Sequence, residues 1–202
     1  MSRTLVLAST SPYRQQLLRQ LGMPFAAVAP VGDEVIDQQV APELLVKHLA
    51  LQKANSIRDR FDDALIIGSD QVFVDPRGRI LGKPGNASAA CRQLKMMAGH
   101  THVFYTGLAV VDCRSGQSLV DYVPFSVTLR PLTAEQIDYY VAEEKPWDCA
   151  GSFKIEGLGI SLMERMEGED YSSLIGLPLI RLTTMLAECG VDVLSPRPNV
   201  CR

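Results

Sequence analysis

The sequence predicts a mixed α/β fold built on a sheet with both parallel and antiparallel strands. Short apolar runs of buried-strand type alternate with segments that carry helix start and stop signals, a pattern typical of α/β proteins. Turn sequences at 76–78 and 114–116 each join two β-patterned segments, and such hairpins place antiparallel neighbours in the sheet. An all-parallel sheet is therefore excluded.

The chain begins with a predicted strand and helix. Residues 4–8 form a short apolar run of buried-strand type. The helix is predicted over 12–22, because Ser11 is a good N-cap, Pro12 suits the first helical position and Gly22 is a natural stop.

The remaining elements follow from the same kinds of signal. Asn86 is a good N-cap. Thr133 and Gln136 form a capping-box pattern at the start of a further helix, which Pro146 ends. The predicted elements are a helix over 42–61, a buried strand over 65–69, a hairpin of 71–75 with 79–82, a helix from Asn86 to near Gly99, long strands over 103–113 and 119–129, a helix over 133–145, a strand near 159–164 and a helix over 178–189.

Charge and cysteine usage limit the class of protein. A formal net charge of −3 gives no general attraction to nucleic acid or anionic membranes. The apolar run near the N-terminus is too short for a signal peptide, and no stretch is long enough to span a membrane. The five cysteines are odd in number, widely spaced and without a C-x-x-C pair, as in reduced cytosolic proteins. We therefore expect a cytoplasmic protein with neither nucleic acid nor membrane as a partner.

The segment from Ser9 to Arg14 lies between a predicted strand and a helix N-terminus. Such a junction presents free backbone N–H groups and a positive dipole end, which suits a phosphate. Ser9 and Ser11 would add hydroxyl donors, and Arg14 would add a bidentate cation. The alternative is a well-capped helix with a surface arginine.

Two charged residues interrupt apolar segments. Lys53 lies four residues after Leu49 and four before Ile57 on the apolar stripe of a predicted helix. Its ammonium therefore either reaches solvent along the stripe or points inward to an anionic site. Asp70 ends a buried strand, where a carboxylate needs an ion pair, hydrogen bonds or a metal. A structural salt bridge is possible, and we favour a carboxylate at a cleft, as general base or metal ligand.

Further charged residues complete a possible phosphate site. Lys83, in Gly82-Lys83-Pro84, ends the predicted hairpin and can return close to Asp70. Glu34 is a loop carboxylate with no specific signal of its own. Two carboxylates, two lysines and a helix N-terminus would suit Mg²⁺-assisted attack on a phosphate. Serine-hydrolase, P-loop and zinc-protease motifs are absent from the sequence, and the three histidines lack metal spacing.

Taken in order, eight segments resemble the motifs of the Maf family of nucleoside triphosphate pyrophosphatases. No single segment is decisive, but their order is specific, and they run from about residue 4 to residue 190. The segments are 7–14, Glu34, 52–54, 67–70, 82–84, 104–107, 150–153 and 176–178.

The resemblance implies a two-lobed fold of the Maf/inosine-triphosphatase type with a central cleft. It implies a single domain over 1–202, in which about 191–202 form a C-terminal tail, and a homodimer. The reaction it implies is the release of diphosphate from a nucleoside triphosphate with Mg²⁺ or Mn²⁺ as cofactor.

The family's functional residues carry over to matching positions of this chain. By resemblance, Asp70 is the proton acceptor that activates water for attack at the α-phosphate. The implied site consists of the catalytic residues Asp70, Lys53, Lys83 and Glu34, the triphosphate-binding residues Ser9, Ser11 and Arg14, and the metal ligands Glu34 and Asp70.

Three positions that vary between the family's branches are Tyr13, Gln71 and Glu156 here. An aromatic residue, Gln and Glu resemble the branch acting on 7-methyl-GTP, although tryptophan is the more usual aromatic. Because 7-methylguanine is cationic, stacking on Tyr13 would contribute on the order of 1–2 kcal/mol when desolvated. Glu156 could accept hydrogen bonds from the guanine N1–H and amino group. Tyrosine stacks less strongly than tryptophan, so we expect lower affinity or selectivity.

Other functions fit the sequence less well. The family branch acting on dTTP and UTP typically carries arginine, threonine and glutamine at the three variable positions. A non-catalytic nucleotide-binding regulator of septum formation would not need Asp70, Lys53 and Lys83 together. An RNA-binding module is disfavoured because no basic stripe is interleaved with aromatic residues.

Overall fold

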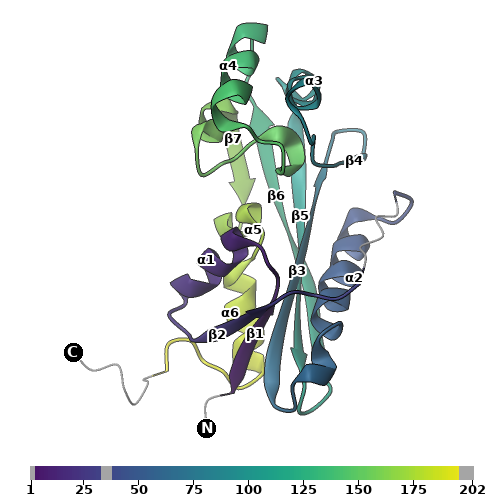
Figure 1. Ribbon diagram of the computed structural model, residues 1–202, viewed down its shortest axis with the longest axis vertical. Coiled ribbons are helices and arrows are strands. Elements are labelled where there is room, and N and C mark those ends of the chain that lie inside the picture. Colours follow the sequence, from purple (N-terminus) through teal and green to yellow (C-terminus); the bar gives the residue numbers. More distant parts are fainter. Residues whose placement is uncertain (1–2, 33–37, 196–202) are drawn as a thin grey trace, which may run out of the picture.

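A computed structural model describes residues 3–32 and 38–195 of the chain (Figure 1). The described residues form one sheet in the order β2-β1-β3-β5-β6-β7, and β4 pairs with the far end of β3. β1 is parallel to β2 and β3, and the other pairings are antiparallel. The predicted mixed α/β fold is confirmed. The strands are β1 (Thr4–Ala8), β2 (Phe25–Val28), β3 (Ala64–Val74), β4 (Ile80–Leu81), β5 (Thr101–Asp112), β6 (Ser118–Leu129) and β7 (Met163–Gly168).

Local sequence signals start most of the helices where expected. Ser11 accepts a hydrogen bond from the first turn of α1, Asn86 does so for α3, and Thr133 with Gln136 forms the capping box of α4. The helices are α1 (Pro12–Gln20), α2 (Pro42–Asn55), α3 (Ala87–Met97), α4 (Ala134–Glu144), α5 (Tyr171–Ile175) and α6 (Leu179–Glu188).

The helix predicted over 42–61 is shorter than expected. α2 ends at Asn55, and a 3₁₀ turn follows at Arg58–Arg60. Asn and Ser are weak helix formers, and the Ser56 hydroxyl donates a hydrogen bond to the Lys53 carbonyl at 2.8 Å. The side chain thus takes the place of the next helical turn.

The last strand lies later in the chain than the predicted 159–164. Residues 158–162 form a 3₁₀ turn, and β7 follows it. Gly159 passes so close to the Lys154 carbonyl that an added Cβ would lie 2.2 Å from its oxygen. This close approach curls the chain before it can extend. β2 and α5 are elements that the sequence pattern did not predict.

Helices cover both faces of the sheet. In Figure 1, α1 and α6 lie on one face of the lower part, α2 lies on the other, and α3 and α4 lie around the upper part. The strands β3, β5 and β6 run through both parts. Each layer has its own buried core, represented by Leu17, Ile67 and Leu182 under α1 and α6, by Val6, Ala50 and Ile66 under α2, and by Phe73, Leu94 and Ile137 in the upper part.

Two glycines let the backbone of α2 lie directly against the sheet. A Cβ added at Gly68 on β3 would lie 2.1 Å from the Ala50 carbonyl oxygen, and one at Gly107 on β5 would lie 2.0 Å from the Val46 carbonyl oxygen. Real Cβ atoms do not come this close, so any larger residue would push the helix away from the strands.

The edge of β3 has a gap between two of its partners. β1 pairs with β3 as far as Ile67, β4 pairs with it from Phe73, and β5 occupies the other edge throughout. Within the described chain, residues 68–72 therefore have no strand partner on the edge of β3 that pairs with β1 and β4. Side chains along a strand alternate between faces, so Asp70 faces α2 and Gln71 faces α5.

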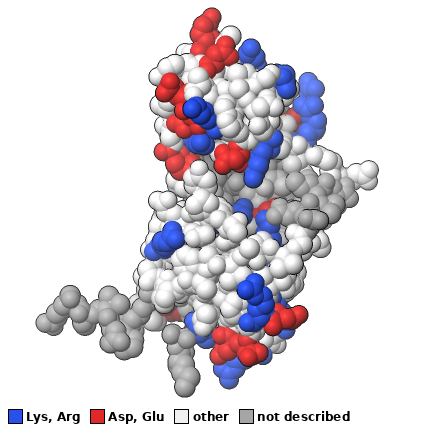
Figure 2. Space-filling view, in the orientation of Figure 1, with Lys and Arg blue, Asp and Glu red and all other residues white. Residues whose placement is uncertain are grey.

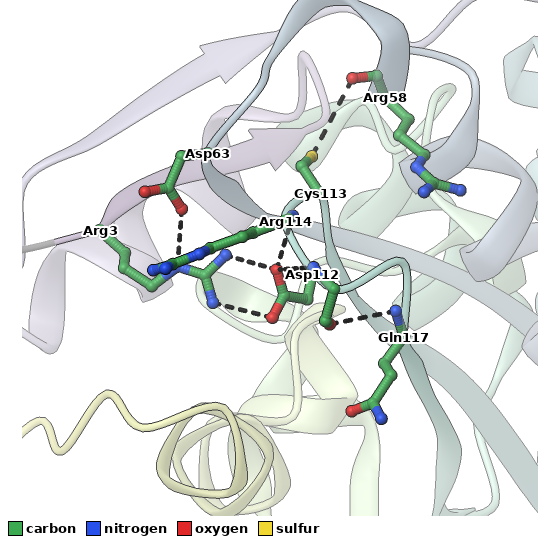
Figure 3. A network of polar contacts seen from close by, with 8 residues as sticks. Arg3, Arg58, Asp63, Asp112, Cys113, Arg114 and Gln117 are labelled. Carbon is green, nitrogen blue, oxygen red and sulfur yellow. Dashed lines mark hydrogen bonds and ion pairs between the residues drawn. The ribbon is translucent and has the colours of Figure 1, made fainter.

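A polar network closes the lower end of the sheet (Figure 3). The Arg3 guanidinium donates to both carboxylate oxygens of Asp112 and, at 3.0 Å, to Asp63. The hydrogen bonds from Arg3 hold the pKa of the Asp112 carboxyl well below its usual range, with further support from backbone N–H groups of 114 and 115. This network ties the start of β1 to the start of β3 and the end of β5.

None of the described helices combines the length and apolar character needed to cross a membrane. The four cysteines in the described part of the chain are unpaired thiols. Of the predicted C-terminal tail, 191–195 form neither helix nor strand and include a turn at 193–194, and 196–202 lie outside the described residues.

Candidate active site

A cleft of about 750 Å³ opens at the gap in the edge of β3, a volume suited to a small-molecule ligand. It is lined by the junction between β1 and α1, by β3, by the loop after β4, by the segment 148–156 and by α5. Figure 2 shows the molecule narrowing at this level, with charged side chains of both signs visible at the waist. The cleft therefore lies between the upper and lower parts, as the two-lobed fold predicts.

Lys53 and Asp70 form a buried ion pair at this cleft. The Lys53 Nζ lies 2.5 Å from Asp70 Oδ1, and the two side chains are only 10% and 9% exposed. Lys53 thus points inward from α2 instead of following the stripe to solvent. The Asp70 carboxylate makes a salt bridge and also lines the cleft, and its role as general base or metal ligand stays a prediction. Removing Lys53 would leave the Asp70 carboxylate buried without its ion-pair partner.

The junction between β1 and α1 is tightly built. The Ser9 hydroxyl accepts a hydrogen bond from the backbone N–H of Ser11 at 3.1 Å, and the Ser11 hydroxyl caps α1. The Arg14 Nε donates to the Gly176 carbonyl at 2.8 Å, which anchors its guanidinium at the cleft. The structure brings all three predicted triphosphate-binding residues to one wall.

Gln71 lies beside Asp70 on the opposite face of β3. Its Nε2 is 2.8 Å from Thr106 Oγ1 and 2.8 Å from the Ser173 carbonyl oxygen. Since Thr106 is its direct neighbour on β5 and Ser173 lies on α5, the Gln71 amide is held by two different elements while lining the cleft.

Tyr13 and Glu156 lie at the same cleft, and both are exposed. Burial raises the pKa of the Tyr13 hydroxyl, and the nearby carboxylates of Glu156 and Asp148 raise it further. The pKa of the Cys149 thiol is raised to about 12, mainly by burial. This cysteine is therefore a poor nucleophile at neutral pH. The Tyr13 ring together with the carboxylates near it favours a cationic ligand.

Lys83 is exposed and lines the cleft from the loop after β4. Glu34, the other predicted metal ligand beside Asp70, lies outside the described residues. Among residues 3–32 and 38–195, no group of three or more His, Cys, Asp or Glu side chains is placed to hold a metal ion. Mg²⁺ is commonly held by one or two carboxylates together with substrate phosphates. The Asp70 carboxylate at the cleft fits such a shared donor set.

Sequence reasoning missed several groups that shape the cleft. Thr106 belongs to the segment 104–107 but has no functional signal of its own, and the carbonyls of Ser173 and Gly176 carry no side-chain signal at all. α5, which presents them, is only five residues long. Asp170 holds it by accepting from the Ser172 backbone N–H at 2.9 Å and from the Ile180 backbone N–H at 2.8 Å.

The fold is shared with solved structures of low sequence identity. A HAM1 protein from Coxiella burnetii superimposes with a TM-score of 0.53 at 12% identity, covering 93% of this chain and 100% of its own. The Staphylococcus aureus Ham1 protein gives 0.51 at 11% identity, covering 94% and 100%. At such identities these matches show the architecture alone, which is the mixed α/β fold.

Sequence comparison identifies the family. The family model described as Maf-like protein matches residues 4–189, so the chain belongs to the Maf family. A relative from Syntrophotalea carbinolica is 58% identical over 95% of this chain and 98% of its own length, and one from Pseudoalteromonas translucida is 48% identical over 98% of both. Both relatives carry the name 7-methyl-GTP pyrophosphatase. The resemblance inferred from the motifs is confirmed.

Proposed function

We propose that this protein hydrolyses 7-methyl-GTP to 7-methyl-GMP and diphosphate. The observation that carries the proposal is the buried Lys53–Asp70 pair at a cleft that also contains Tyr13, Gln71 and Glu156. A water-activating carboxylate and a base-selecting set thus share one cavity. The names of the relatives from Syntrophotalea and Pseudoalteromonas support the same substrate.

Asp70 acts as the general base. Lys53 holds Oδ1 of its carboxylate, which leaves the second oxygen to accept a proton from water. The water oxygen then forms a bond to the α-phosphorus, and the bond from that phosphorus to the bridging oxygen breaks. Diphosphate leaves with the bonding electron pair.

Hydroxyl and cationic groups hold the triphosphate. Ser9, Ser11 and Arg14 contribute from the wall at the start of α1, where the positive end of the helix dipole favours phosphate. Lys83 adds an exposed positive charge from the loop after β4. Mg²⁺ or Mn²⁺, held by Asp70 and Glu34, would supply further stabilisation of phosphate charge.

The base is recognised by charge and by hydrogen bonding. The cationic ring of 7-methylguanine stacks on Tyr13, whose surroundings are acidic. Glu156 offers a carboxylate to the N1–H and amino group. Gln71 offers the oxygen of an amide whose nitrogen is already occupied by the protein.

The family resemblance also supports a single domain over 1–202, a cytoplasmic location and a homodimer. Size-exclusion chromatography with light scattering should give a mass twice the 22.2 kDa of one chain. A monomeric mass at micromolar concentration would refute the dimer.

Substrate preference tests the proposed function. Diphosphate release should be measured for 7-methyl-GTP, GTP, dTTP and UTP with Mg²⁺ or Mn²⁺, and we expect the highest kcat/KM for 7-methyl-GTP. A preference for dTTP or UTP would refute the substrate and favour the pyrimidine alternative.

The role of Asp70 is tested by Asp70→Asn, which should lower kcat by about 10²–10⁴-fold, the usual contribution of a general base. Asp75→Asn is the matched control. Asp75 is also a buried carboxylate on this segment, but it caps the hairpin turn and pairs with Arg79. An Asp70→Asn protein with wild-type turnover would exclude the general-base mechanism and favour a nucleotide-binding regulator.

A further inference from the structure

Gln71 and Thr106 form a hydrogen-bond chain with the backbone of α5. Thr106 is fully buried, and its Oγ1 lies 2.8 Å from the Ser173 carbonyl oxygen. A carbonyl oxygen only accepts, so the single hydroxyl hydrogen of Thr106 points to Ser173. The lone pairs of that hydroxyl are then left to accept, and the group that faces them at 2.8 Å is the Gln71 amide.

This chain determines which way the Gln71 amide is turned. Two carbonyl oxygens, of Ser173 at 2.8 Å and Leu174 at 3.2 Å, face the same end of the side chain as the Thr106 hydroxyl. All three groups require a donor, so this end must be the Nε2 amide group. With the opposite orientation, Oε1 would face two carbonyl oxygens and a hydroxyl with no hydrogen left to give.

The Gln71 Oε1 consequently points away from α5. No hydrogen bond is made to it by the described residues, and these contain no buried side-chain oxygen or nitrogen without a partner. The oxygen is therefore open to solvent, and the space that Gln71 lines is the cleft. It presents an obligate hydrogen-bond acceptor there.

We propose that Thr106 is a positioning residue for substrate selection. Its hydroxyl fixes the Gln71 amide so that only Oε1 meets the ligand, and the cleft therefore selects a nucleobase edge that offers an N–H donor at this point. This inference rests on the proposed function, because 7-methylguanine offers such donors at N1 and N2. Adenine presents an acceptor at N1.

Two substitutions of Thr106 separate its hydroxyl from its shape. Thr106→Val keeps the volume and removes the hydroxyl, and Thr106→Ser keeps the hydroxyl. For Thr106→Val we expect the preference for 7-methyl-GTP over ATP, as a ratio of kcat/KM, to fall by about tenfold, the usual effect of one hydrogen bond. The fall should come mainly from KM for 7-methyl-GTP, and Thr106→Ser should restore the preference. Thr128→Val is the control, because Thr128 also makes a hydroxyl hydrogen bond, to Thr101 on the neighbouring strand.

Gln71→Glu tests the orientation directly. The carboxylate keeps an acceptor oxygen and adds a charge that would attract a cationic base, but it cannot donate to Thr106 or α5. We expect Gln71→Glu to lose the preference for 7-methyl-GTP. A variant with equal or higher preference would show that Gln71 acts alone and would overturn the proposal, as would an unchanged preference in Thr106→Val.

An NMR spectrum of the side-chain amides tests the positioning role of Thr106 independently of the proposed substrate. The side-chain NH₂ resonances of Gln71 are identified by their disappearance in Gln71→Glu. In the wild type they should exchange slowly with water, and in Thr106→Val they should shift and exchange faster, with Thr106→Ser close to wild type. If the wild type does not prefer 7-methyl-GTP but these signals behave as expected, the proposed substrate fails while the positioning role stands. Identical signals in the wild type and Thr106→Val would overturn the positioning role.

Discussion

Replacing Gly68 by alanine should move α2 away from the sheet and disturb the Lys53–Asp70 pair. An added Cβ would lie 2.1 Å from the Ala50 carbonyl oxygen, whereas carbon–oxygen contacts are comfortable only from about 3.3 Å. The helix must therefore shift by roughly 1.2 Å at this point. Both groups belong to backbones held in regular structure, so no change of rotamer relieves the contact.

The expected cost follows from this geometry. Overpacking a well-filled core destabilises by about 1–3 kcal/mol, and a clash between two backbones belongs at the upper end of that range. With an m-value of about 2 kcal/mol/M, the urea midpoint should fall by roughly 1–1.5 M. Lys53 is one residue from Ala54, whose backbone nitrogen would lie 3.0 Å from the same Cβ. Because misplacing a catalytic group by about 1 Å can cost around 10²-fold, kcat/KM should fall by a similar factor.

Urea unfolding followed by circular dichroism and the diphosphate-release assay provide the two measurements. Gly82→Ala is the control for stability, since a Cβ there would have no atom within 4 Å. Because Gly82 lines the cleft, kcat/KM is compared with the wild type. A Gly68→Ala protein with the midpoint of Gly82→Ala and the kcat/KM of the wild type would refute the view that this close contact positions Lys53.

Two further predictions concern parts of the molecule outside the reaction. Arg3→Met should cost about 2 kcal/mol of stability, because it removes charged hydrogen bonds to Asp112. We expect kcat to stay unchanged, because Asp112 lies five residues along β5, about 17 Å, from the residue that pairs with Asp70 at the cleft. Urea unfolding measures the stability, and the activity assay measures kcat. The pKa of buried His102 is lowered, chiefly by burial, so its contribution to stability is complete above about pH 6.5 and is lost as the pH falls below it, by at most about 1.4 kcal/mol per pH unit. In urea unfolding at pH 7.5 and 5.5, His102→Phe should lose less stability than the wild type.

An exposed histidine provides the control for the pH prediction. His48→Gln, at an exposed position on α2, should keep the wild-type dependence of stability on pH. If His102→Phe loses as much stability as the wild type on acidification, burial of this imidazole is not responsible. A large fall in kcat for Arg3→Met would contradict the separation of the lower network from the cleft.

The parts of the fold that were predicted correctly are those set by local chemistry. Ser11, Asn86 and Thr133 satisfy backbone N–H groups within three residues of themselves, so the neighbouring sequence suffices to locate the helices. β2 and α5 were missed for the opposite reason. β2 is a four-residue edge strand, and α5 depends on Asp170 reaching the backbone of the next helix, a contact between elements that no local pattern shows.

The site divides along the same line. Asp70 and Lys53 were noticed because a charge in an apolar stripe is costly, but the sequence left the direction of Lys53 open. The tight approach of α2 over Gly68 and Gly107 decides it, and that approach depends on the register of β3 against β5. The carbonyl of Ser173 could not be predicted, since a backbone oxygen is present at every position and only the tertiary fold selects one.

Asp70 and Gln71 are adjacent in sequence, yet their supports come from opposite sides of the sheet. Lys53 on α2 holds the first residue, and Thr106 with α5 holds the second. Substitutions at 71 or on α5 can therefore retune which nucleotide is accepted while hydrolysis stays intact. Inserting or deleting one residue between 68 and 70 would instead exchange the two faces and abolish both roles together. Position 71 therefore tolerates a change of side chain far better than this stretch of β3 tolerates a change of length.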